Sequence, residues 1–318
     1  MMTLLVFKER LKLFYGRYEI YLLPLIKFIG VLITLILLNG KIGYMSLLKN
    51  FAVVLIISLL CSFLPVSLVV AILALFITAH IYALSMELAV VVMIILLIMF
   101  VAYYKFAPRD GLVLILMPVF YMLRIPYLIP IAVGLVATPV SIISVIFGTM
   151  LYYILQFVST NAAVITNISA DNALLKINTL LENLLNKKEM YLAMAVFSIV
   201  VIVVYVIRRL SIDYAWSIAI ITGGLINLGL FLIGNIVLNT TEKGSVLVMV
   251  IGSIISIALA FILQFCVFSV DYSRTEHTQF EDDEYYYYVK AIPKINITVP
   301  EVSVKRINAR RTRKTSHK

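Results

Sequence analysis

Charged side chains are scarce in this chain of 318 residues, of which only 13% are Asp, Glu, Lys or Arg. Soluble domains average about 25% charged and about 45–50% apolar residues. Here 63% of the residues are hydrophobic and the mean hydropathy is +1.07. A folded chain cannot hide that much apolar surface from water by itself. We therefore predict an all-α integral membrane protein whose solvent is the lipid bilayer.

Cysteine and histidine are also rare, and their placement argues against metal or redox chemistry. Cys61 and Cys266 both lie within apolar runs, and the three histidines are scattered along the chain. No HExxH, Walker loop, GxSxG or GxGxxG pattern occurs. Intramembrane proteases need clustered metal ligands or paired aspartates. We therefore expect no metal, no cofactor and no enzymatic activity.

The formal net charge of +10 is concentrated at the two ends of the chain. In a membrane protein such a bias predicts topology and contact with anionic lipid headgroups. Nucleic-acid binding is not expected, because no zinc-ligand spacing or basic helix–turn–helix pattern accompanies the charge.

Residues 21–269 divide into apolar segments that predict a polytopic transmembrane bundle. The count is about 10 transmembrane segments if each short segment crosses the bilayer, and fewer if a short pair enters and returns on one side. The segments are 21–39, 51–63, 66–84, 87–104, 111–123, 127–138, 139–159, 190–207, 215–238 and 245–269.

The stretch from Gly111 to Pro139 is apolar but broken. Two short pieces, 111–123 and 127–138, meet at Arg124. Prolines interrupt them, and each removes a backbone donor and clashes with the preceding helical turn. Freed backbone groups at membrane depth persist only where they are buried in protein or line a wet cavity. The sequence therefore predicts a functional irregularity in this stretch.

Both ends of the chain differ from the bundle. Residues 1–20 place apolar side chains at helical spacing among basic ones, which predicts an amphipathic interfacial helix. A basic flank that only fixes orientation is the alternative.

Within the bundle, an amphipathic connecting helix is expected at 170–188. Residues 270–318 predict a mostly non-helical tail, with β-prone runs at 295–299 and 302–307 and a basic end.

The distribution of Lys and Arg predicts the orientation. With the N-terminus in the cytoplasm, the loop 105–110, the pair Arg208 and Arg209, and the tail all fall inside. The basic residues of 176–188 would then lie outside, which argues for the opposite orientation. We expect both termini to be cytoplasmic and the membrane to be the plasma membrane.

Four polar side chains at membrane depth are candidates for substrate binding. Ionisable residues inside a membrane are functional candidates because their desolvation is costly, and this applies to His80, Glu87 and Arg124. Arg124 can hold an anionic group or pair with Glu87; a packed histidine, a helix-start glutamate and an interfacial arginine are the alternatives. Asn227 lies between glycines near the middle of its segment, either as a substrate contact or as an interhelical hydrogen bond.

Two functions from different classes remain open on the sequence. A transporter or permease component for a small solute or ion is favoured by the broken stretch and by Asn227. A membrane scaffold of a cell-envelope complex is the alternative, recruiting a cytoplasmic protein through an acidic run followed by tyrosines. The tail residues expected to bind that partner are Tyr285, Tyr286, Tyr287 and Tyr288. Homo- or hetero-oligomers are compatible with either function.

Overall fold

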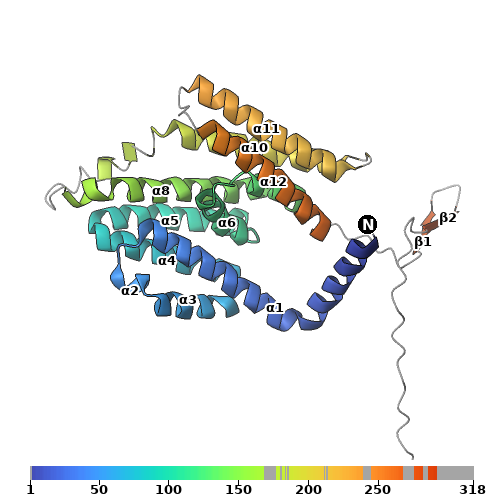
Figure 1. Ribbon diagram of the computed structural model, residues 1–318, viewed down its shortest axis with the longest axis horizontal. Helices are drawn as coiled ribbons and strands as arrows, with labels where there is room; N and C mark the ends of the chain where they lie inside the picture. Colours follow the sequence, from blue (N-terminus) through green and yellow to red (C-terminus); the bar gives the residue numbers. More distant parts are fainter. Residues whose placement is uncertain are drawn as a thin grey trace, which may run out of the picture. The chain divides into compact units, whose positions relative to one another are not determined.

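The computed structural model describes residues 2–167, 177–179, 181, 182, 184, 186–210, 212, 214–238, 245–267, 276–281 and 286–291. They belong to two compact units, Tyr18–Phe268 and a second unit that joins Met1–Arg17 to Ser269–Lys318. The helices of the first unit are drawn in Figure 1. Their bounds are α1 Met2–Ile42, α2 Ser46–Lys49, α3 Phe51–Phe63, α4 Val66–Leu84, α5 Met86–Phe106, α6 Gly111–Met122, α7 Leu128–Val136, η1 Pro139–Ser141, α8 Ile142–Asn167, α10 Lys188–Arg209, α11 Ala215–Val237 and α12 Ser245–Val267.

Each of the ten predicted apolar segments contains a helix. Among the described residues, seven helices are long and apolar enough to cross a membrane, which supports the prediction of a helical membrane protein. They are Leu13–Ile42 within α1, α4, α5, Pro139–Thr166, α10, α11 and Val246–Val267. The helices α3, α6 and α7 are shorter than a bilayer-spanning helix needs to be.

Helix boundaries follow local chemistry that is readable in the sequence. The side chain of Asn50 accepts a hydrogen bond from the backbone N–H of Ala52 at 3.0 Å and so caps α3. Pro65 precedes the first residue of α4, where a backbone donor is not needed. Ser85 separates α4 from α5, and its hydroxyl accepts from the N–H of Leu88. These dividers turn one long apolar run into three helices.

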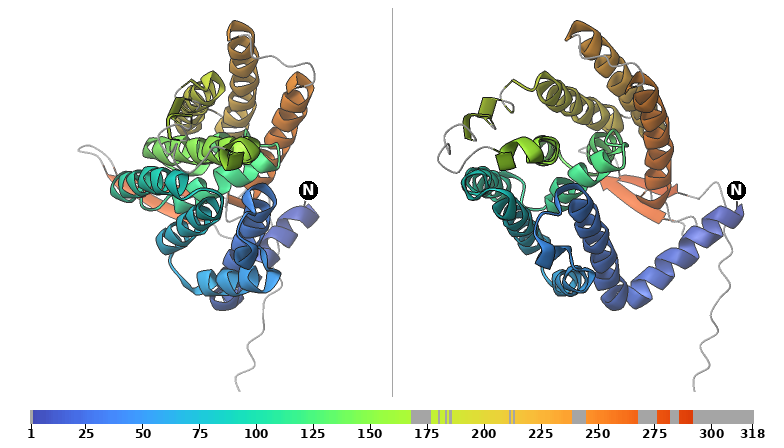
Figure 2. Two further views of the ribbon diagram at one scale, coloured as in Figure 1. Left: turned by 90° about the vertical axis from the view of Figure 1, so that its left-hand side faces the viewer. Right: turned by 60° about the vertical axis from the view of Figure 1, so that its left-hand side comes forward.

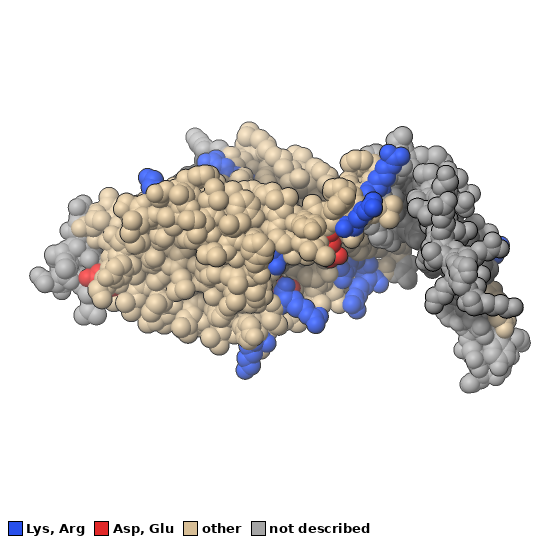
Figure 3. Space-filling view, turned by 90° about the horizontal axis from the view of Figure 1, so that it is seen from below, with Lys and Arg blue, Asp and Glu red and all other residues tan. Residues whose placement is uncertain are grey.

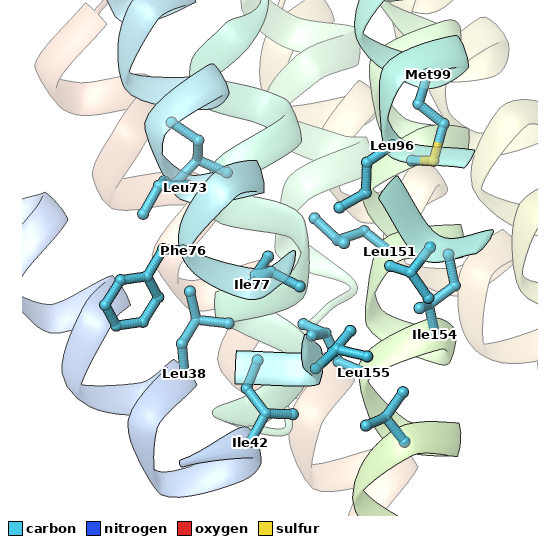
Figure 4. Close-up of a cluster of buried hydrophobic side chains, with 14 of the residues drawn as sticks. Leu38, Ile42, Leu73, Phe76, Ile77, Leu96, Met99, Leu151, Ile154 and Leu155 are labelled. Carbon is cyan, nitrogen blue, oxygen red and sulfur yellow. The ribbon is translucent and has the colours of Figure 1, made fainter. Parts of the chain in front are cut away.

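The larger core lies among α1, α3, α4, α5, α6 and α8. Figure 4 shows side chains of α1, α4, α5 and α8 pointing toward one another in this core. Leu38 of α1, Phe76 of α4 and Leu155 of α8 are among its buried members. Apolar packing of this kind holds one half of the bundle together.

A second half consists of α7, α10, α11 and α12, with a core that includes Ile131, Val200 and Ile220. A third cluster, containing Met117, Val145 and Phe197, connects α6 and α8 to α7 and α10. In both views of Figure 2 the green helices α6–α8 lie between the blue-to-teal helices and the gold-to-orange ones. The broken stretch 111–138 therefore lies between the two halves, with Leu112, Leu123 and Val136 exposed.

The outer surface of the bundle is apolar. Figure 3 shows a wide area of one face without a charged side chain. Large apolar side chains point outward from the long helices, as at Leu225, which is 63% exposed. A soluble monomer rarely exposes apolar patches of this extent, so this surface is suited to contact with lipid.

The N-terminal part of α1 keeps the predicted apolar stripe, with Phe7, Leu11 and Phe14 exposed. The helix runs on through Ile42, and its backbone leaves helical geometry at Tyr18, close to the predicted boundary at residue 20. Binding of this segment to anionic lipid stays a prediction.

The predicted connecting helix 170–188 is described only at a few positions, of which 177–179, 181, 182 and 184 are helical. In the tail, β1 Glu276–Glu281 and β2 Tyr286–Ala291 form an antiparallel pair with Phe280 opposite Tyr287. The β-prone runs 295–299 and 302–307 and the residue Tyr285 lie outside the described residues.

Candidate functional site

The broken stretch enters the bundle and returns to the same end, and we call it the re-entrant hairpin (residues 111–138). Its first arm, α6, runs parallel to α8: Met117 lies against Gly148, and one helical turn later the Tyr121 ring stacks on Tyr152 at 4.2 Å. Its second arm, α7, ends directly before η1 and the start of α8. Both ends of the hairpin therefore lie at the N-terminal end of α8.

The arms of the hairpin are short compared with the thickness of a bilayer. Tyr152, level with the turn, lies about ten residues from Ile142, or about 15 Å along α8. The hydrocarbon core is about 30 Å thick. Residues 111–138 are thus a pair of short helices, of 12 and nine residues, joined by a turn.

The turn of the hairpin is a Schellman motif. The N–H of Ile125 bonds to the carbonyl of Phe120 at 2.9 Å, and the N–H of Arg124 bonds to that of Tyr121 at 3.0 Å. This motif needs a left-handed residue, usually glycine, and Arg124 occupies the position with φ 63°. Pro126 then prevents continuation of the helix. An arginine held in a conformation that favours glycine is a reason to look for a role of its side chain.

Helices α11 and α12 close around this turn. The side-chain amide of Asn227 donates to the Tyr127 carbonyl across a long 3.5 Å, and Asn227 is 0% exposed. Gly252 lets the Arg124 carbonyl approach α12, because a Cβ at this glycine would lie only 2.8 Å from that oxygen. The predicted pair Arg124 and Asn227 is therefore brought to one turn.

The returning arm is fixed at its far end by Arg208. Its guanidinium donates to the carbonyls of Leu135 and Ala137, the last acceptors of α7. The same group lies over the rings of Tyr205 and Trp216, at 5.3 and 5.8 Å from their centroids. One side chain thus clamps α7 to α10.

A polar cavity of about 400 Å³ lies at the turn, between α8, α10, α11 and α12. The hairpin contributes Tyr121 and Tyr127, and α11 contributes Asn235. Tyr153 and Gln156 come from α8. The volume is within the range of small-molecule sites, about 300–1,000 Å³. Phenol, amide and charged side chains therefore converge at this cavity.

Charged side chains lie at the edge of this cavity. Lys187 and Glu189, at the start of α10, line it and form a 3.7 Å ion pair with both side chains partly exposed. The charges of Glu189 and Arg124 both act on the Tyr152 hydroxyl. The buried Tyr121 hydroxyl faces that of Tyr153 without meeting the geometry of a hydrogen bond. The cavity therefore offers hydroxyls, amides and a balanced pair of charges.

The other predicted site residues lie elsewhere. His80 is buried in α4, where its Nδ1 accepts from the backbone N–H of Met45 at 3.2 Å and its ring meets Phe76 edge-on. Glu87 lies at the start of α5 and accepts from the Ser85 hydroxyl at 2.5 Å. None of the four predicted site residues lines the cavity itself, since Arg124 and Asn227 lie at the turn beside it. In the tail, Tyr286, Tyr287 and Tyr288 belong to β2, and the Tyr288 side chain is 78% exposed.

The tyrosines of the cavity were not among the predicted site residues. Tyr121, Tyr127 and Tyr153 interrupt otherwise aliphatic segments. A phenol buried in a membrane segment usually finds a polar partner. Tyrosines within apolar segments could therefore have been predicted to face a polar site. Their convergence depends on the hairpin folding back, which local pattern does not reveal.

Comparison with protein families, curated proteins and solved structures finds no match to this chain. The case for function therefore depends on the geometry of the cavity and the hairpin.

Proposed function

We propose that this protein is a transporter or permease component for a small solute or ion, with its site in the cavity at the turn of the re-entrant hairpin. The observation that carries the proposal is a polar cavity at the turn between two short helices of the bundle. Transport sites in membrane proteins are commonly built from broken helices near the midplane. A catalytic role is not proposed.

The lining favours a solute that is neutral or zwitterionic. Apart from Lys187 and Glu189, which balance each other, the lining residues are uncharged. Tyrosine rings and amides suit a compact molecule with both apolar faces and hydrogen-bonding groups.

The proposed orientation places both termini in the cytoplasm and the protein in the plasma membrane. Lys105, Arg109, Arg208 and Arg209 then lie at the cytoplasmic end, as the positive-inside rule expects. The two ends of the hairpin share this side. Lys187 and Glu189 lie at the other end of α10, so the cavity is open toward the outside. Two cytoplasmic termini require an even number of crossings, so α3, whose 13 residues would span a thinned bilayer, crosses together with the seven long helices.

Uptake by proteoliposomes tests the proposal. A panel of labelled amino acids, sugars and nucleosides is offered to vesicles containing the full chain. The variants Asn227→Ala and Asn235→Ala are compared with Leu225→Ala, a change on the exposed face of α11. We expect at least one solute to enter with the wild type and with Leu225→Ala, and much more slowly with the other two variants. Entry at the rate of empty vesicles for the whole panel would contradict the proposal.

A scaffold role is the second candidate, and the tail hairpin is the observation that favours it. A two-stranded sheet is marginally stable in water and keeps strand edges free for pairing with a partner. Deletion of residues 272–318 should abolish co-purification of a cytoplasmic protein while leaving the bundle folded. Identical pull-downs with and without the tail would exclude this role.

A further inference from the structure

Two buried side-chain oxygens beside the turn of the re-entrant hairpin have no hydrogen-bond partner among the described residues. They are Oδ1 of Asn227 on α11 and Oγ of Ser253 on α12. These residues are 0% and 1% exposed. An unpaired buried polar group is costly and calls for an explanation, such as a bound ion or water.

The two oxygens lie at the same level of facing helices. The antiparallel register of α11 and α12 is set by the contacts Ser217–Gln264 and Gly224–Ile257. Asn227 follows Gly224 by three residues and Ser253 precedes Ile257 by four, so each lies on the contact face of its helix. Continuing the register places Asn227 opposite Ser253.

Backbone oxygens of the hairpin turn lie near the level of Asn227 and Ser253. The Tyr127 carbonyl accepts the long 3.5 Å bond from Asn227, and the Arg124 carbonyl approaches α12 at Gly252, next to Ser253. The turn therefore adds two oxygen donors to those of Asn227 and Ser253.

We propose that Asn227 Oδ1, Ser253 Oγ and the carbonyls of Arg124 and Tyr127 form a binding site for a monovalent cation such as Na⁺. All four donors are uncharged hard oxygens, whereas Ca²⁺ and Mg²⁺ sites are usually built with carboxylates. A bound cation would join the hairpin turn to α11 and α12. This inference rests on the proposed transport function and names its coupling ion.

Thermal unfolding of the purified full-length protein tests the site, with Na⁺ replaced by N-methyl-D-glucamine at constant ionic strength. Ligands that bind only the folded state raise the unfolding midpoint with concentration. We expect a saturable rise with Na⁺ in the wild type and its loss in Asn227→Ala and Ser253→Ala. Ser256→Ala is the matched control and should keep the rise, because the Ser256 hydroxyl is already bonded to the Gly252 carbonyl at 2.7 Å. No rise specific to Na⁺ in the wild type, or an equal rise in all variants, would overturn the site.

Two further measurements keep the test decisive. If a variant does not fold, equilibrium binding of radioactive sodium to the wild type is measured instead. A stoichiometry near zero would overturn the site. Solute uptake with and without a Na⁺ gradient separates the two proposals. Entry that is independent of Na⁺ overturns the cation site and leaves transport standing. A Na⁺ response that depends on Asn227 without entry of any solute overturns transport and leaves the site.

Discussion

Gly252 offers the sharpest test of how the hairpin turn is seated. Replacing it with alanine would put a Cβ 2.8 Å from the Arg124 carbonyl oxygen and 3.2 Å from Cε2 of Tyr127. The turn or α12 must then move by several tenths of an ångström. Overpacking of this kind costs about 1–3 kcal/mol.

Gly229 is the matched control, because a Cβ added there meets nothing within 4 Å. Alanine is favoured over glycine inside a helix by about 1 kcal/mol, and both variants receive this gain. The difference between Gly252→Ala and Gly229→Ala therefore isolates the packing cost. It corresponds to roughly 2–10 °C in the unfolding midpoint of a domain of this size.

Thermal unfolding in detergent, followed by the fluorescence of the single tryptophan, Trp216, measures this difference. We expect Gly252→Ala to unfold below Gly229→Ala. Equal midpoints would show that the turn does not contact α12, and the site described here would have to be abandoned.

Three further predictions concern single side chains. Arg124→Gly should be more stable than Arg124→Ala by about 1 kcal/mol, because both lose the charge but only glycine is relaxed at φ 63°; a more stable alanine variant would contradict the left-handed turn. Arg208→Lys should lower stability by about 1–2 kcal/mol, since lysine cannot hold two carbonyls in a planar fork. The guanidinium of Arg209 lies over Tyr205 and over no other described ring. Arg209→Lys should therefore change the unfolding midpoint little in the same melting assay. Ser85→Ala removes the cap of α5 and should cost about 1 kcal/mol, and an unchanged midpoint would mean that the cap is replaced by other contacts.

The sequence predicted the helices of the bundle well because each carries its own signal. Apolar runs mark the spans, and Asn50, Pro65 and Ser85 mark their ends. The prolines and Arg124 predicted a break in the right place. Whether the two pieces cross or return was not predictable, since it depends on packing against α8 that has no local signature.

The candidate site was predicted only in part. Asn227 and Arg124 meet at the turn because α11 and α12 pack on the hairpin, and the hydrogen bond from Asn227 to Tyr127 joins residues far apart in the chain. His80 was selected for being ionisable at membrane depth, yet its environment is a packed contact with Phe76 and Met45. Residue type identifies candidates, whereas only the tertiary arrangement shows which of them share a cavity.

The central claim is that residues 111–138 return to the side from which they enter, below a cavity open to the other side. Single cysteines at Asp110, Thr138, Gln156 and Asn235, in a background without native cysteines, test it with a membrane-impermeant thiol reagent applied from each side. We predict that Asp110→Cys and Thr138→Cys label from the same side, and that Gln156→Cys and Asn235→Cys label only from the opposite one. Labelling of Asp110→Cys and Thr138→Cys from different sides would contradict the re-entrant hairpin and the site built on it.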